Sequence, residues 1–167
     1  MTTEIQLDTN MTTPTERIRT IKTATCSNLS GTAELTYSVI HTQGQTYIQV
    51  LANSGNGIFS KDPVSLDQIK ALLAMRPVGT PIGTPALRSL FAGKSVNTAG
   101  YLTAILRNEG LLQPSAENQN CLETADSTAF DTTLQQLLAL TPEALIEQDI
   151  YNASNTLTPK GKSTKSM

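Results

Sequence analysis

The clearest alternation of apolar and polar residues lies in two neighbouring segments, TAELTYSVIH (32–41) and QTYIQVLAN (45–53). Both are rich in β-branched and aromatic residues, which favour strands. The polar link between them contains Gly44, which can adopt a positive φ. The pattern predicts a β-hairpin with one packed face and one solvated face. IFS (58–60) suits a third short strand, so the expected sheet covers about residues 32–60.

Helical spacing begins after residue 62. One helical face carries the apolar residues Val64, Leu66, Ile69, Leu72 and Leu73, and Ser65 is a good N-cap residue for this helix. A helix is therefore predicted from about 66 to 75. The next segment, RPVGTPIGTP, holds three prolines and two glycines, so it is expected to form a loop and to mark a candidate sub-domain boundary at 76–85.

Four further helices are expected toward the C-terminus, at 85–92, 97–109, 127–140 and 141–153. Asn97 is a suitable N-cap for the second of these, and Gly110 a suitable C′ residue. Ser127 or Asp126 caps the third, and Thr141 with proline at N1 begins the fourth. Between these helices the segment 113–126 is polar and irregular, and no strand is predicted there.

The N-terminal region gives opposing signals. Thr13, Pro14 and Glu16 form a capping-box arrangement that predicts a short helix over 14–22. The β-branched threonines that follow oppose this helix, because they lose rotamer freedom in helical backbone. Residues 1–13 and the basic segment 154–167 are expected to be flexible tails.

These elements predict one α+β domain at 14–153, with a small antiparallel sheet packed against four to five helices. The chain has 167 residues, 38% of them hydrophobic and only 4% aromatic, so Leu, Ile, Val and Ala must supply the core. Residues 61–112 carry six basic and three acidic residues, whereas 113–153 carry seven acidic and no basic residues. This asymmetry fits either an anion-binding surface or two complementary faces of one fold.

The sequence offers few groups for catalysis or metal binding. Cys26 and Cys121 are the only cysteines and His41 is the only histidine, so no metal, cofactor or catalytic residue is expected. A disulfide stays arithmetically open. The N-terminus carries acids instead of a signal peptide, and no apolar run approaches about 20 residues. A cytoplasmic location with reduced cysteines and no membrane partner is therefore expected.

The segment GKSVNTAGYLTAILRNEGLL (93–112) follows a predicted helix and contains a turn and a second helix. Its ending, in which apolar residues precede Gly110 and two leucines, buries one helix face and returns the chain to the core. Residues 84–112 resemble the helix-turn-helix part of winged-helix DNA-binding domains. Arg88, Lys94 and Gly100 depart from that pattern, and no clear β-ribbon wing follows Leu112. Gly100 predicts a close helix or strand contact.

The resemblance implies double-stranded DNA as partner and a regulatory role. The implied contact residues are Arg88, Lys94, Ser95, Asn97, Thr98, Tyr101, Thr103 and Arg107. The same helix ending also suits a helix that is merely packed on the sheet. Two other hypotheses stay open: a protein–protein or homo-oligomeric module using the acidic helices at 127–153, and an enzyme with an unfamiliar site.

Overall fold

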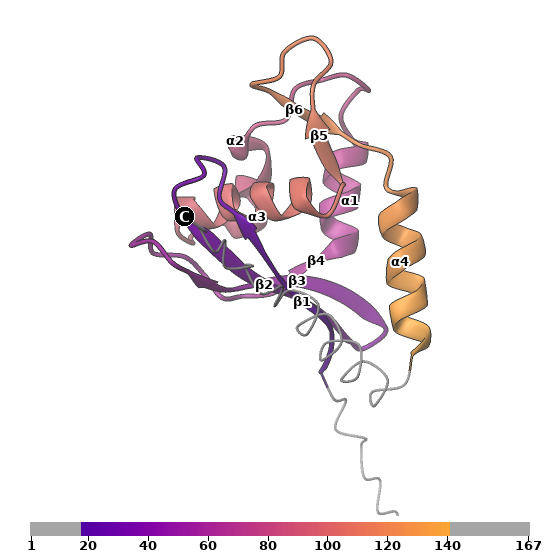
Figure 1. Cartoon of the computed structure of the whole chain (residues 1–167). Helices are drawn as coiled ribbons and strands as arrows, with labels where there is room; N and C mark the ends of the chain where they lie inside the picture. Colours follow the sequence, from indigo (N-terminus) through magenta and orange to yellow (C-terminus); the bar gives the residue numbers. More distant parts are fainter. Residues whose placement is uncertain (1–17, 141–167) are drawn as a thin grey trace, which may run out of the picture.

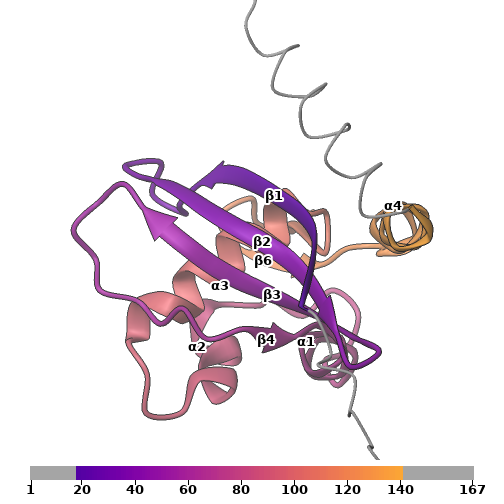
Figure 2. The ribbon, with the colours of Figure 1, turned by 90° about the horizontal axis from the view of Figure 1, so that it is seen from below.

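A computed structural model describes residues 18–140 of the chain. Figure 1 shows a curved antiparallel sheet with its helices on the inner, concave side, and Figure 2 shows the outer side of the sheet. The mixed α+β class is confirmed. The predicted count of four to five helices is slightly high. The described residues form four α-helices, and a short 3-10 helix only continues one of them. The predicted helix at 141–153 and both predicted tails lie outside the described residues.

The four-stranded sheet has the order β1-β2-β3-β4. Its strands are β1 (Arg19–Ser27), β2 (Glu34–Thr42), β3 (Gln45–Asn53) and β4 (Val64–Ser65). The predicted hairpin is confirmed as β2–β3, and its turn contains Gly44 at a φ of 71°. The buried apolar residues of the hairpin that face the helices include Tyr37, Val39, Ile48 and Val50.

Two predictions about strands and helices near the N-terminus are wrong. Residues 19–22 of the predicted helix 14–22 belong to β1, where Ile21 is buried in the core. Pairing with β2 and the strand preference of isoleucine and the threonines prevail over the capping-box pattern. Residues 58–60 do not form a strand, and β4 pairs with β3 in their place.

The helices lie close to their predicted positions. They are α1 (Leu66–Ala74), α2 (Thr84–Leu87) continuing into the 3-10 helix η1 (Arg88–Phe91), α3 (Val96–Asn108) and α4 (Thr128–Ala139). Ser65 caps α1 by accepting a hydrogen bond from the Gln68 backbone N–H. Ser95, not Asn97, caps α3, because its hydroxyl accepts the Asn97 backbone N–H.

A short two-stranded sheet follows α3, although no strand was expected in this segment. It pairs β5 (Leu112–Pro114) with β6 (Leu122–Thr124). Ile82, in the loop between α1 and α2, adds an antiparallel bridge to Leu122, with its N–H 2.6 Å from the Leu122 carbonyl oxygen. Isolated strands of three residues carry too short a pattern to be recognised by period alone.

Helix α3 is the central helix of the domain. In Figure 1 it lies between the sheet on one side and α2 with β5–β6 on the other. Leu102, Ile105 and Leu106 are almost completely buried, as predicted for its packed face. The close contact expected at Gly100 is absent, since an added Cβ would lie 3.9 Å from the Thr84 methyl group and near nothing closer.

Candidate functional site

Two of the predicted contact residues on α3 are buried. Thr98 and Thr103 each expose only 1% of their surface. The Thr98 hydroxyl accepts a hydrogen bond from the Ser60 backbone N–H at 2.9 Å, and the Thr103 hydroxyl donates to the Ala99 carbonyl at 2.8 Å. Both side chains therefore stabilise the fold, and neither presents a free polar group to a ligand.

Tyr101 is half-buried and joins α3 to the loop after β3. Its hydroxyl accepts a hydrogen bond from the Asn53 side-chain amide at 2.8 Å. Its ring packs edge-on against Phe59, with 5.9 Å between the ring centroids. The approach of this loop requires Gly57, because a Cβ there would lie 2.1 Å from the Tyr101 hydroxyl oxygen.

The turn before α3 is tied to the same loop. The Ser95 hydroxyl and the Asn97 side-chain amide both donate to the Ile58 carbonyl, at 2.6 and 3.0 Å. Lys94 forms an exposed ion pair with Asp62. Hydrogen bonds from Lys94 and then from Ser60 lower the pKa of the Asp62 carboxyl. The positive charge of Lys94 therefore has a carboxylate partner beside it.

Arg88 and Arg107 differ from Lys94. Both are exposed, and among the described residues neither forms an ion pair or a side-chain hydrogen bond. Since guanidinium groups are always charged and carry five N–H donors, these two residues are available to an anion.

Three adjoining hollows lie along the open side of α3, with volumes of about 610, 480 and 340 Å³. We call them together the α3 groove. Its walls come from residues 26–31, 81–84 and 119–122, from Arg88, and from the open side of α3. Leu29 lines all three hollows, and Arg107 lines the two larger ones. Among residues 18–140, the charged side chains in the walls are Arg88 and Arg107, and no carboxylate lines them.

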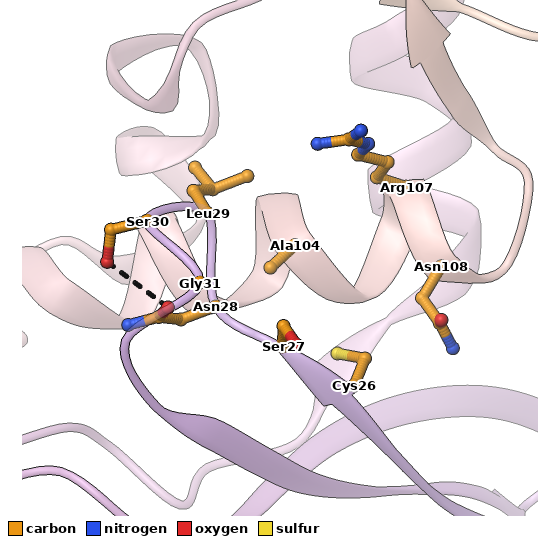
Figure 3. Close-up of a pocket in the computed structure, with 9 residues that line it drawn as sticks. All are labelled: Cys26, Ser27, Asn28, Leu29, Ser30, Gly31, Ala104, Arg107 and Asn108. Carbon is orange, nitrogen blue, oxygen red and sulfur yellow. Dashed lines mark hydrogen bonds between the residues drawn. The ribbon is translucent and has the colours of Figure 1, made fainter.

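The turn between β1 and β2 forms one side of the groove. Figure 3 shows this turn beside α3, with Leu29 and Arg107 extending to the same side of the helix. The turn stabilises itself: the Asn28 side-chain carbonyl accepts the Thr32 backbone N–H at 2.9 Å, and Gly31 has a φ of 70°. Sequence reasoning missed this wall, because SNLSG reads as a turn between strands only once β1 is recognised.

A polar cluster lies beneath the end of the groove. Glu109 exposes only 6% of its side chain, forms an ion pair with Lys22 and accepts a hydrogen bond from the Tyr37 hydroxyl. Burial, and then the hydrogen bond to Glu109, raise the pKa of Tyr37 far above its ordinary value. Asn108 donates to the same hydroxyl at 2.9 Å. In this cluster the Tyr37 phenol keeps its proton, and the Glu109 carboxylate beside it is paired with the Lys22 ammonium group.

Both cysteines are free and line adjoining hollows, so the disulfide left open by the sequence is not formed. Burial, followed by the nearby Glu109 and Glu34 carboxylates, raises the pKa of the Cys26 thiol. A thiol with a raised pKa is a poor nucleophile at neutral pH. Between residues 18 and 140 no group of three or more His, Cys, Asp or Glu residues is placed to hold a metal ion.

Within the same range no helix is long and apolar enough to cross a membrane. No known protein family, curated protein or solved structure matches the chain. The geometry of the α3 groove is therefore the basis for assigning a function.

Proposed function

We propose that the protein binds nucleic acid, with Arg88 and Arg107 contacting phosphates in the α3 groove. The observation that carries this proposal is the charge of the groove walls, which within the described part of the chain present two unpaired guanidinium groups and no carboxylate. Arginine is well suited to phosphate, because its planar fork makes paired hydrogen bonds. The net charge of the whole chain is −2, so attraction to a polyanion must come from such a local surface.

The order of elements is a second argument for the proposal, set beside the winged-helix DNA-binding domains that residues 84–112 resemble. After α1, the chain passes through Ile82, α2 and α3, and then forms the β5–β6 ribbon in the position where those domains have a wing. The bridge from Ile82 to Leu122 ties this ribbon to the start of α2. The ribbon lies beside Arg107, because residues 119–122 line the same hollow.

The proposed contacts are narrower than those implied by the sequence. Arg88, Arg107 and the exposed part of Asn97 border the groove and are included. Thr98 and Thr103 are left out, because each exposes only 1% of its surface and its hydroxyl is hydrogen-bonded within the fold, although Thr103 borders the hollow of about 480 Å³. The contribution of Lys94 to phosphate binding is reduced, because its ammonium group is paired with the Asp62 carboxylate.

Fluorescence anisotropy with labelled single-stranded DNA, single-stranded RNA and duplex DNA at about 50 mM salt tests the proposal, because phosphate contacts are strongest at low salt. We expect wild-type protein to bind and Arg88→Ala/Arg107→Ala to lose about tenfold or more in affinity, with a shallower salt dependence. Lys61→Ala/Arg76→Ala is the matched control, since it removes two positive charges outside the groove walls. Absence of binding by the wild type, or equal losses in both double variants, contradicts the proposal.

A further inference from the structure

We infer that the α3 groove takes a single strand of nucleic acid rather than a duplex. This inference rests on the proposed function and names the form of nucleic acid that fits the site. It follows from three features of the groove: how little of α3 is open, where the arginines lie, and which side chains surround them.

Helix α3 is too enclosed to enter a duplex. A helix that reads DNA lies within the major groove, which is about 12 Å wide, and presents exposed side chains to the base edges. Here Thr98 and Thr103 are each 1% exposed and Ala104 is 4% exposed. The sheet lies against one side of α3, and the β1–β2 turn with Leu29 lies beside its open side (Figures 1 and 3). A rigid duplex therefore meets the turn before it meets the helix.

The arginines line concave hollows. Arg107 borders the hollows of about 610 and 480 Å³, which meet at Leu29, and Arg88 borders the third. A single strand is flexible enough to follow such a path and place phosphates near both guanidinium groups. A duplex presents its phosphates on a stiff convex surface, with a persistence length of about 150 base pairs.

The remaining walls suit unpaired bases. Tyr101 lines the hollow that Arg88 also borders, and Leu29 exposes 44% of its surface where the hollows meet. Aromatic side chains beside a basic path stack the bases of single strands. Gln119 and Asn120 line the hollow of about 480 Å³, and their amides both donate and accept hydrogen bonds. The Watson–Crick edges of bases are open to such groups only when the bases are not paired with another strand.

The test compares three labelled probes of one 15-nucleotide sequence: single-stranded DNA, single-stranded RNA and duplex DNA. The full chain is titrated against each at about 50 and 150 mM salt, because the electrostatic part of binding weakens with salt. We expect at least one single strand to bind about tenfold or more tightly than the duplex, as base stacking contributes about that much or more per base. The RNA and DNA arms show whether the sugar matters.

Two substitutions locate the binding. Leu29→Ala, at an exposed turn position, is expected to weaken single-strand binding about threefold or more without affecting the fold. Tyr101→Leu is expected to lose about tenfold, whereas Tyr101→Phe keeps the ring and is expected to stay within about threefold of the wild type. Circular dichroism shows that each variant is folded before its affinity is compared.

The outcomes separate this inference from the proposed function. Duplex binding equal to or tighter than single-strand binding overturns the inference and leaves the proposed function standing. A single-strand preference that neither Leu29→Ala nor Tyr101→Leu changes overturns the placement of the strand in the groove. Failure of all three probes to bind overturns the proposed function, and the inference falls with it.

Discussion

The Lys22 ammonium nitrogen lies 2.7 Å from Glu109 Oε1, and this ion pair joins strand β1 to the C-terminal cap of α3. The Tyr37 hydroxyl donates to the same carboxylate from β2. Glu109 exposes only 6% of its side chain, whereas Lys22 exposes 35%. The carboxylate therefore depends on these partners in place of water, and together they hold the sheet against the helix that borders the groove.

Lys22→Met is expected to lower the free energy of unfolding by about 1.5–3 kcal/mol, because it leaves the Glu109 carboxylate buried without its cation. Lys94→Met is the matched control. It breaks an ion pair with Asp62 in which both side chains are about half exposed, so its effect on stability should be much smaller. Urea unfolding of both variants measures the difference. Equal losses would show that burial of Glu109 does not set the strength of its ion pair.

The raised pKa of Tyr37 leads us to expect a loss of folding stability at alkaline pH. Its folded-state pKa is raised by burial and by Glu109, so the unfolded chain releases the phenol proton first, near pH 10. The stability that the protonated Tyr37 phenol contributes to the fold is fully present below about pH 10. Above that pH it decreases by about 1.4 kcal/mol per pH unit.

Tyr37→Phe removes this titrating group and is expected to lose stability less steeply above pH 10. Urea unfolding at pH 8, 10 and 11 compares the two proteins. Identical pH slopes would mean that the Tyr37 phenol ionises equally in the folded and unfolded states.

The sequence predicted the elements whose pattern is local and long. The β2–β3 hairpin, α1 and α3 each carry several apolar residues at a regular period, and each forms close to its predicted place. β1 was predicted in part as helix, because a capping-box pattern at residues 13–16 outweighed the threonines that follow. Its strand form depends on pairing with β2, which no local pattern shows.

The groove was less predictable than the fold. Arg88 and Arg107 were both singled out from the helix-turn-helix resemblance, and both border it. Leu29 was not singled out, since it reaches α3 from about 75 positions earlier in the chain through the packing of the sheet. Thr98 and Thr103 look available on a helical projection, and only tertiary contacts with the loop and the core show that they are buried.

Gly57→Ala is expected to destabilise the protein by about 1–3 kcal/mol, because the new methyl group would lie 2.1 Å from the Tyr101 hydroxyl oxygen. Removing that oxygen should relieve most of the overlap, since the next atoms are Asn97 Nδ2 at 3.3 Å and the Tyr101 ring carbon at 3.4 Å. Gly57→Ala is therefore expected to cost much less in a Tyr101→Phe background. A double-mutant cycle by thermal or urea unfolding measures this coupling. Additive losses would show that the backbone at Gly57 moves away from the ring.

Gly100→Ala is expected to stabilise the protein by about 0.5–1 kcal/mol. Glycine is unfavourable inside a helix by about that amount relative to alanine, and here the added methyl group meets no atom closer than 3.9 Å. The shift should appear as a higher urea midpoint with an unchanged slope. A loss of stability would indicate that α2 and α3 lie closer together than the ordinary contact at Thr84 implies.

Asp62→Asn is expected to strengthen nucleic-acid binding, because it releases Lys94 from the carboxylate that now neutralises it. Lys94 directly precedes the α3 cap, two residues from Val96 in the groove wall. One added phosphate contact should steepen the logarithmic salt dependence by about 0.7–0.9. Asp67→Asn removes the same charge at an exposed position on α1 and is the matched control. Anisotropy titrations across salt concentrations compare the two variants, and equal slopes would place Lys94 outside the binding surface.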